Sequence, residues 1–318
     1  MVKHFLVISK ILALTLSVFA STNTNAQSIS RLLVPAYGNP CCDGGASLWQ
    51  GLISWAKESP NTLSVIVNPF NGPGASPIDP NYINNAGRGP LVDLHRSGAE
   101  LYGYIFTSHA QRNLNEVFTD IERFTQSAYY RNTGVQLSGF FIDEMSNDLA
   151  NINYYRQIRS FIASLDADLN IIGNPGVSSI VDHQGLGDAA IAEYATIFNT
   201  LVVFENDFSS YTRSYSAPVW QSGLPAASFA HIVHGTNSIN ELNQALLLAN
   251  MRGAGLVYIT DDVLFNPYDQ LPSYFLQIRD YFENMPDQQC SGLQLIGGDL
   301  QDRHILPFPG IFGVNGPG

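Results

Sequence analysis

The segment Gly139-Phe-Phe-Ile-Asp-Glu144 is a run of apolar residues that ends in two acids, and it gives the clearest indication of the fold. An apolar run that does not alternate with polar residues is typical of a parallel strand buried on both faces. Neighbouring side chains on a strand point to opposite sides. If Asp143 faces the interior of the sheet, Gly139 and Phe141 face the same way, and Phe140 and Ile142 face the surrounding helices.

Seven further segments have the same apolar, β-branched character. Together with the first, the expected strands are Leu32–Ala36, Leu63–Asn68, Glu100–Phe106, Leu137–Asp143, Leu169–Gly173, Thr200–Glu205, Phe229–His234 and Gly255–Thr260. Apolar residues between them recur at three- and four-residue spacing, which predicts helices. Eight alternating strands and helices favour a single closed (β/α)₈ TIM barrel of class α/β over an open doubly wound sheet.

Two details refine the predicted helices. Ser238 and Glu241 form a capping box ahead of a helix over Ile239–Met251, and Gly253 stands where a C-cap glycine belongs. The helix after the second strand is interrupted by Gly87 and by Gly89-Pro90. We therefore expect that helix to be broken.

The two ends of the chain differ from the barrel. Lys3 and Lys10 flank a short apolar stretch, a second one follows at Ile11–Ala20, and Thr24-Asn-Ala26 resembles a cleavage site. This pattern predicts a secretory signal peptide over residues 1–26 and a secreted protein. The alternative, a membrane anchor, would need about 20 apolar residues. We expect the barrel over residues 27–286 and an irregular tail over 287–318, packed on the barrel or disordered.

The charge of the chain limits its partners. The formal net charge is −12 at pH 7, and only 13% of the residues are charged. No basic patch is visible, so a nucleic-acid partner is not expected, and no later segment is apolar enough to span a membrane. An acidic surface favours a cationic ligand such as an amino-sugar polymer, although ordinary solubility charge gives the same balance. We expect a monomer.

The chain has three cysteines, Cys41, Cys42 and Cys290. Export permits a disulfide. Because adjacent cysteines rarely pair with each other, we expect Cys290 to pair with Cys41 or Cys42, with one thiol left over. No histidine stands at ligand spacing from these cysteines or from another histidine, so neither a metal site nor any other cofactor is expected.

The residues that end the predicted strands are nearly all polar. Barrel enzymes place their sites at this C-terminal rim. Asp143 and Glu205 each end an apolar run and are the leading catalytic candidates, and Glu144 joins them as a loop ligand or an orienting partner. Two carboxylates flanking one bond are what glycoside hydrolysis requires. The alternative for either acid is to cap the following helix, and for Asp261-Asp262 a capping or turn role is favoured.

Other side chains of the rim, with nearby aromatic rings, are candidates for sugar contacts. Tyr104 is a further candidate for ring stacking, whereas most aromatic residues of such a chain belong to the core. Histidines near the strands are interpreted first as core or rim hydrogen-bonding groups. The expected substrate-binding residues are Tyr37, Asn68, Thr107, Asn174, Trp220, His234, Tyr258, Asp261 and Asp262.

At these residues the chain resembles the spherulin-4-like family, which includes secreted microbial endo-glycosidases of α-1,4-linked galactosamine or N-acetylgalactosamine polymers. The matching segments run in order from about residue 31 to 280. They are Leu32-Leu-Val-Pro-Ala-Tyr37, Val65-Ile-Val-Asn-Pro-Phe-Asn-Gly-Pro-Gly74, Gly103-Tyr-Ile-Phe-Thr107, Gly139-Phe-Phe-Ile-Asp-Glu144, Val202-Val-Phe-Glu205, Phe229-Ala-His-Ile-Val-His-Gly235, Tyr258-Ile-Thr-Asp-Asp262, Asn266-Pro-Tyr-Asp269 and Leu271-Pro-Ser-Tyr274.

The resemblance implies a (β/α)₈ barrel that hydrolyses an amino-sugar exopolysaccharide. It places conserved acids on Asp143, Glu144 and Glu205, with Asp143 as nucleophile or charge stabiliser and Glu205 as acid/base. If the sugar carries an N-acetyl group, the carbonyl of that group could attack instead, oriented by Asp143. The double-cysteine loop and the tail depart from the family pattern.

Two rival functions remain open at this point. One is a cell-surface or matrix carbohydrate-binding protein without turnover, because a barrel alone does not define an activity. The paired acids favour the enzyme. The other is a metal-assisted deacetylase, which would need a His/Asp ligand set that the sequence does not offer.

Overall fold

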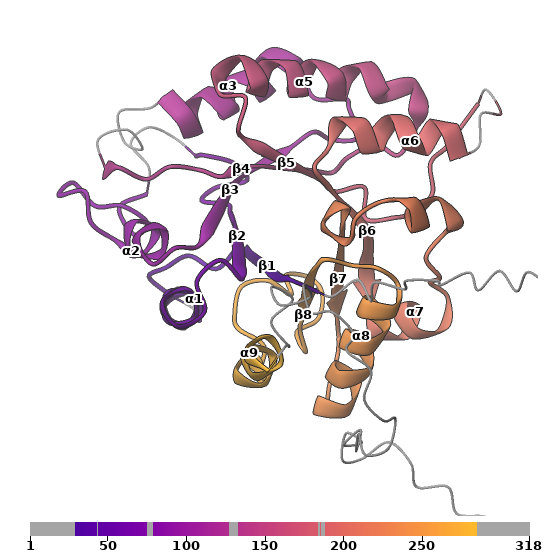
Figure 1. The fold of residues 1–318 in the computed structure, drawn as a ribbon. Helices are drawn as coiled ribbons and strands as arrows, with labels where there is room; N and C mark the ends of the chain where they lie inside the picture. Colours follow the sequence, from indigo (N-terminus) through magenta and orange to yellow (C-terminus); the bar gives the residue numbers. More distant parts are fainter. Residues whose placement is uncertain are drawn as a thin grey trace, which may run out of the picture. The chain divides into compact units, whose positions relative to one another are not determined.

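Eight parallel strands close into a barrel in the computed structural model, which describes residues 29–42, 44–74, 79–126, 133–183, 185 and 188–284. Each strand pairs with the next along the chain. The ring closes between β1 and β8, where Arg31 lies opposite Leu256 and Leu32 opposite Val257. Figure 1 shows the strands at the centre and the helices around them. The predicted (β/α)₈ barrel is confirmed.

All eight predicted strands are present, and no strand end differs from its predicted position by more than two residues. The observed strands are β1 (Arg31–Ala36), β2 (Leu63–Val67), β3 (Glu100–Phe106), β4 (Gly139–Asp143), β5 (Asn170–Gly173), β6 (Thr200–Asp207), β7 (Phe229–His234) and β8 (Leu256–Ile259). The extra length of β6 goes with a register shift between Val202 and Phe204, which marks a bulge. Nothing in the apolar pattern of this strand predicts it.

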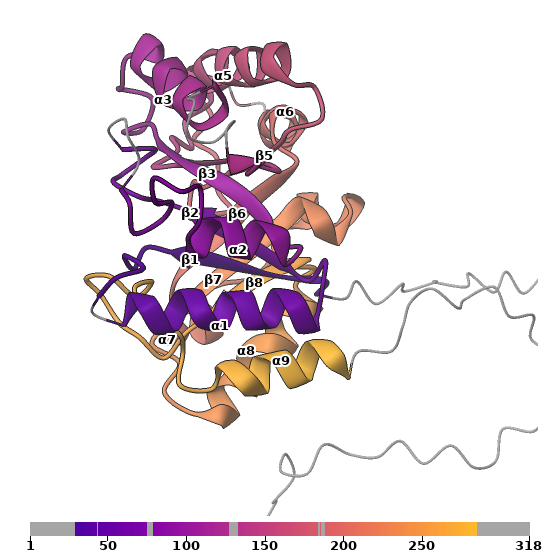
Figure 2. The same cartoon turned by 90° about the vertical axis from the view of Figure 1, so that its left-hand side faces the viewer.

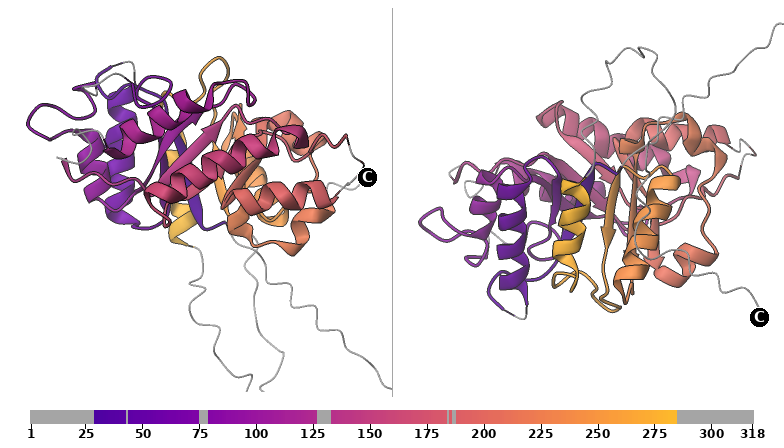
Figure 3. Two further views of the ribbon diagram at one scale, coloured as in Figure 1. Left: turned by 90° about the horizontal axis from the view of Figure 1, so that it is seen from above. Right: turned by 60° about the horizontal axis from the view of Figure 1, so that its bottom comes forward.

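The helices lie outside the strands in every view (Figures 2 and 3). They are α1 (Gly45–Glu58), α2 (Pro90–Arg96), α3 (Leu114–Gln126), α5 (Ile152–Leu165), α6 (Asp188–Ile197), α7 (Phe208–Arg213), α8 (Ile239–Met251) and α9 (Phe275–Glu283). Short 3₁₀ turns occur at Leu149–Asn151, Val219–Gly223 and Ala226–Ser228. The sides of α1 and α9 meet through Trp55, whose ring packs on Phe275 and Phe282.

The Ser238 cap and the glycine stop of α8 are confirmed, whereas the carboxylate of Glu241 accepts the backbone N–H of Asn237, one residue before the predicted partner. The backbone N–H of Glu241 donates to the Ser238 hydroxyl at the start of α8, and Gly253 has the positive φ of a C-cap glycine. Between β2 and Pro90, where α2 begins, the described residues 68–74 and 79–89 form no helix, as the interrupting glycines predict.

The two faces of β4 separate the inner core from the outer one. Phe140 packs on Phe124 of α3, so it faces the helices. Phe141 stacks on Tyr104 of β3, whose hydroxyl hydrogen-bonds Asp143, so both face the barrel interior. The predicted alternation along Gly139–Asp143 is therefore confirmed. It aims the carboxylate of Asp143 into the barrel mouth.

Two predictions about the chain ends lie outside the described residues. These are the signal peptide at 1–26 and the irregular tail at 287–318. Within the described residues, no helix combines the length and the apolar character that a bilayer crossing needs.

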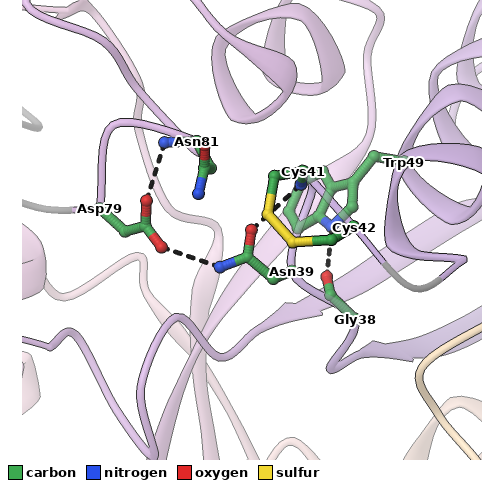
Figure 4. The surroundings of a disulfide bond; sticks show 7 residues. All are labelled: Gly38, Asn39, Cys41, Cys42, Trp49, Asp79 and Asn81. Atoms are coloured by element: carbon green, nitrogen blue, oxygen red, sulfur yellow. Dashed lines mark hydrogen bonds between the residues drawn. A yellow bond between two sulfur atoms is a disulfide. The ribbon is translucent and has the colours of Figure 1, made fainter.

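The cysteine prediction was wrong for Cys41 and Cys42, which are bonded to each other. They occupy a tight turn between β1 and α1 (Figure 4). Both backbone N–H groups donate to Asn39, that of Cys41 to the side-chain oxygen and that of Cys42 to the carbonyl, and this turn brings the two sulfur atoms together. Cys290, the expected partner, lies outside the described residues.

Candidate active site

Asp143 and Glu205 face each other across the side chain of Asn174, which follows β5 between them. One nitrogen, Nδ2 of Asn174, donates at 2.7 Å to Oδ1 of Asp143 and at 2.7 Å to Oε2 of Glu205. The two accepting oxygens therefore lie no more than about 5.4 Å apart, twice 2.7 Å. The sequence predicted that these three residues lie on one rim, but it did not predict that the Asn174 amide donates to both acids.

The orientation of the Asn174 amide is fixed by a third hydrogen bond. Its oxygen accepts the backbone N–H of Gly176 at 3.0 Å. The amide oxygen must face that N–H, and the nitrogen must face the two carboxylates, so only one orientation satisfies all three partners. Gly176 has a φ of +67°, and its carbonyl accepts the backbone N–H of Glu205 at 3.0 Å. The turn after β5 thus holds both the amide and Glu205.

Tyrosine rings surround the carboxylate pair. The hydroxyl of Tyr268 donates to Oε1 of Glu205 at 2.5 Å, and that of Tyr104 hydrogen-bonds Asp143. Tyr37, at the end of β1, contacts both rings edge-on, with centroids 5.6 Å from Tyr104 and 5.4 Å from Tyr268. The rings keep water from much of the pair while their hydroxyl groups supply hydrogen bonds.

The surroundings raise the pKa of Asp143 to about 6. Burial is the main cause, and the nearby charge of Glu205 adds to it. Hydrogen bonds from Tyr104, from the backbone N–H of Glu144 and from Asn174 act in the opposite direction, because they favour the ionised form. The carboxylates in turn raise the pKa of Tyr104 and of Tyr268 beyond what burial alone does, so both phenols stay protonated as donors.

Glu205 lies on β6 just after the register shift between Val202 and Phe204. Phe204 packs on the rings of Tyr211 and Tyr215, on the helical side of the strand. Glu205, the next residue, therefore faces the barrel interior. Asp207 then caps α7 by accepting the backbone N–H of Ser210. Bulges are common at the rims of barrels, and after this one Glu205 lies opposite Ile232 of β7 and accepts the hydrogen bond from Asn174.

The end of β4 is held by the loop that follows β3. The hydroxyl of Thr107 donates to the carbonyls of Asp143 and Glu144, at 3.0 and 2.9 Å. The backbone of Glu144 has a φ of +48°, and the backbone N–H of His109 donates to its carbonyl. The Glu144 carboxylate is exposed at the rim, where it accepts a hydrogen bond from Ser108 at 3.3 Å.

The position of Thr107 does not suit its predicted role as a substrate contact. Its side chain is fully buried, and its hydroxyl is committed to the end of β4. Tyr258 is also fully buried, with its ring 6.0 Å from that of Tyr268. Both residues therefore hold other parts of the site in place, Thr107 the end of β4 and Tyr258 the ring of Tyr268. Their position on apolar strands predicts burial more directly than it predicts contact with a sugar.

Trp220 is at the wrong end of the barrel for its predicted role. It lies in the 3₁₀ turn Val219–Gly223, which leads into β7, and its ring packs on Phe229, the first residue of that strand. The carboxylates are at the opposite ends of the strands. The prediction was wrong because an aromatic residue in a loop gives no indication of which rim the loop belongs to.

The other predicted contacts lie on the correct rim, and most of them are occupied by loop hydrogen bonds. Asn68 accepts the backbone N–H of Gly72, and Asp261 accepts that of Ser273. Asp262 accepts the side-chain amide of Gln270 at 2.7 Å. The favoured capping role of the two acids agrees with these contacts.

The two central histidines of β7 differ in their surroundings. His231 is fully buried, lies 2.7 Å from the Tyr211 hydroxyl, and has its pKa lowered to about 3 by burial, so it is a core residue, as the sequence indicated. His234 lies opposite Asp207 at the rim, and burial lowers its pKa as well. Within the described residues, no group of three or more His, Cys, Asp or Glu side chains is placed to hold a metal ion.

Tyr268 is the main residue that the sequence prediction missed. It lies in the loop after β8, within Asn266-Pro-Tyr-Asp269, one of the segments that carry the family resemblance. That segment indicated membership of the family, but it gave no indication of a role for Tyr268. Only the closure of the barrel brings residue 268 against Glu205 and Tyr37.

Comparison with known proteins places this barrel in a family. The model of the family described as "Spherulation-specific family 4" matches residues 31–282. Spherulin-4 of Physarum polycephalum is 30% identical over 265 residues, which are 80% of this chain and 70% of that protein. The chain therefore belongs to the spherulation-specific family 4, as the sequence resemblance indicated.

Solved structures share the fold. Sph3 of Aspergillus clavatus, solved in complex with GalNAc, superposes with a TM-score of 0.62 at 20% identity, over 81% of this chain and 98% of that one. A putative alpha-L-fucosidase of Bacteroides thetaiotaomicron superposes with a TM-score of 0.50 at 11% identity, over 86% of this chain and 99% of that one. At these identities the likeness concerns the fold.

Proposed function

We propose that this protein is a secreted glycoside hydrolase that cleaves an α-1,4-linked galactosamine or N-acetylgalactosamine polysaccharide within the chain. The observation that carries the proposal is the pair Asp143 and Glu205, held by one amide with their nearest oxygens no more than about 5.4 Å apart, twice 2.7 Å. A protein that only binds sugar has no need to bring two carboxylates together against their mutual repulsion.

The proposed roles follow from the contacts of each acid. Asp143 accepts hydrogen bonds from Tyr104, Glu144 and Asn174, which stabilise its ionised form. The pKa of Asp143 is still raised to about 6, because burial and the charge of Glu205 outweigh these bonds, but the group stays mostly ionised at neutral pH. An ionised carboxylate suits the group that attacks or stabilises the positively charged sugar carbon. Glu205 then protonates the leaving oxygen and later takes a proton from water. The exposed carboxylate of Glu144 would orient a substrate at the edge of the site.

The separation of the acids leads to an expectation for stereochemistry. Retaining enzymes hold their carboxyl groups about 5–5.5 Å apart, whereas inverting enzymes leave about 6.5–9.5 Å for a water molecule. The closeness of Asp143 and Glu205 therefore favours retention. Attack by the N-acetyl carbonyl of the substrate, with Asp143 orienting it, would also retain the configuration. The anomer released first, followed by NMR, tests this point.

The choice of substrate rests on three supports. The family resemblance implies an amino-sugar polymer, and Sph3, which shares the fold, was solved with GalNAc. The formal net charge of −12 is compatible with a polymer that carries free amino groups. The tyrosine rings around the carboxylates suit a sugar, because the C–H faces of a pyranose pack on aromatic rings. Residues 1–26 would serve as the export signal and be removed.

The test is release of reducing ends from acetylated and from deacetylated α-1,4-galactosamine polymers. Wild type should release them, and Asp143→Asn and Glu205→Gln should each lower the rate by roughly 10³-fold or more while the fold stays intact. Asp168→Asn is the matched control. Asp168 is an exposed acid in the loop between α5 and β5, at the opposite end of the barrel, and its loss should have no effect.

Two outcomes would contradict the proposal. Full activity in either carboxylate variant would remove that residue from the mechanism. Binding of the polymer by wild type without any release would support the carbohydrate-binding function instead.

A further inference from the structure

An apolar loop tip lies on the rim that carries the candidate active site. Between β8 and α9, three consecutive apolar side chains face solvent. Val263 is 55% exposed, Leu264 67% and Phe265 104%. Soluble proteins rarely place several large apolar residues side by side in water unless the patch binds something. The loop starts at the C-terminal end of β8, so it belongs to the same end of the barrel as the carboxylates.

The segments that flank this tip are firmly held. The carbonyl of Asp262 accepts the backbone N–H of Gly235, and its carboxylate accepts the side-chain amide of Gln270. Further along, Asp269 lies so close to Gly38 that a Cβ on this glycine would be 2.4 Å from the Asp269 carbonyl oxygen. The tip is thus displayed on a loop anchored at both ends, and a backbone held in this way loses little freedom on binding.

The tip is connected to the reaction centre through a short piece of chain. Tyr268, the donor to Glu205, is three residues after Phe265. At no more than about 3.6 Å per residue, the two Cα atoms lie within about 11 Å. The backbone N–H of Tyr37 donates to the Tyr268 carbonyl at 3.0 Å, so β1 holds this part of the loop in place.

A second exposed ring stands on the other side of Tyr37. Phe70, in the loop after β2, is 83% exposed, and its backbone N–H donates to the carbonyl of Gly72. Both β2 and β8 pair with β1, so the loops of Phe70 and Phe265 flank the strand that ends at Tyr37. Three rings thus lie on three adjacent sectors of the rim.

We propose that Phe265 and Phe70 bind sugar units of the polymer beyond those at the carboxylates, on either side of Tyr37. The inference rests on the proposed function and adds that the protein binds more sugar units of the polysaccharide than those at the carboxylates. The apolar face of a pyranose ring packs on an exposed aromatic ring without needing a hydrogen-bond partner, which fits a tip where Leu264 and Val263 add only apolar surface. A polysaccharide bound at Phe265 would continue past Tyr268 to the carboxylates.

The experiment compares binding and cleavage in matched variants. Phe265→Ala is measured alone and with Phe70→Ala, and Phe265→Tyr keeps the ring. Val219→Ala is the control, because Val219 is also 83% exposed but lies in the turn that leads into β7, at the other end of the barrel. Binding to the partly deacetylated α-1,4-galactosamine polymer is measured in the Asp143→Asn background, so that turnover does not interfere.

We expect Phe265→Ala to weaken polymer binding at least about fivefold, and the double variant to weaken it further. Phe265→Tyr and Val219→Ala should bind as the parent does. In the active background, cleavage of the polymer should show a raised KM, whereas cleavage of a disaccharide, which is too short to reach the tip, should be unchanged. Because the side chain is exposed, the thermal midpoint should stay the same in each variant.

Different failures can be told apart. If wild type cleaves the polymer and Phe265→Ala binds it equally well, this inference is overturned and the proposed function stands. If wild type neither binds nor cleaves any polymer, both are overturned. Sedimentation with phosphatidylcholine vesicles and the mass in solution identify other occupants. Retention on vesicles or dimer formation lost in Phe265→Ala, without an effect on the polymer, would show that the tip serves a membrane or a second copy.

Discussion

Replacement of Asp143 by asparagine should change how the stability of the fold depends on pH. Asp143 is partly buried beside Glu205, and its pKa is raised from the ordinary value of 3.8 to about 6. A carboxyl group with a raised pKa binds more protons in the folded state than in the unfolded state between these values. The free energy of unfolding contributed by Asp143 is therefore largest at low pH and falls as the pH rises through 6.

The size of this change follows from the shift. Each pKa unit corresponds to about 1.4 kcal/mol, so the contribution of Asp143 falls by about 2 to 3 kcal/mol between pH 4 and pH 7.5. Asparagine has no charge to bury, so the variant should lack this loss. The stability of Asp143→Asn relative to wild type should improve by that amount from pH 4 to pH 7.5, whatever the constant cost of the new side chain.

Urea unfolding of both proteins at the two pH values measures the difference directly. In thermal scans the same change should appear as a gain of roughly 4–12 °C for the variant relative to wild type. Glu205→Gln should give part of the effect, because Glu205 is the second cause of the raised pKa. A stability difference that is the same at both pH values would refute the reasoning and would mean that Asp143 is solvated in the native protein.

Three further outcomes are expected. Asn174→Ala should lower kcat about 100-fold or more, because it removes two hydrogen bonds to carboxylates. It should also move the acidic limb of the kcat/KM profile to higher pH, because Asn174 lowers the pKa of Asp143. Both effects are read from pH–rate profiles. Tyr268→Phe should lower kcat roughly 10- to 100-fold with little change in KM, because only the hydroxyl on Glu205 is lost; steady-state kinetics decide this, and an unchanged kcat would remove the hydrogen bond from the mechanism. Trp220→Ala should lower the thermal midpoint by several degrees and leave KM unchanged, whereas a raised KM would restore this residue as a substrate contact.

The barrel could be predicted from the sequence because its signals are local. Apolar runs such as Leu201–Phe204 mark buried parallel strands, and the acid at the end of each run marks the rim. The strand alternation that aims Asp143 inward needed no more than the period of two along Gly139–Asp143. These inferences use residues that are close in the chain, where side-chain chemistry and backbone geometry constrain each other directly.

The parts that could not be predicted depend on contacts between distant segments. The bulge in β6 leaves no mark in the apolar run, yet it decides the register of Glu205 against β7. The sequence shows Asn174 as a polar strand end, but its third bond, to Gly176, is what gives the amide its direction. Trp220 could not be assigned to a rim without the fold. The Cys41–Cys42 bond depends on how Asn39 closes one turn.

Tyr268 lies near the C-terminal end of the barrel sequence, and this has a consequence for the order in which the site is completed during synthesis. Both acids belong to β4 and β6 and are made well before the segment that covers them, which follows the last strand. A nascent chain that ends after Ile259 has every strand of the ring but leaves Glu205 without its phenol and Tyr37 without its neighbour. Synthesis from N- to C-terminus therefore withholds the finished reaction centre until the loop before α9 has emerged. Premature termination in that loop would leave the eight strands without α9 and with an incomplete site.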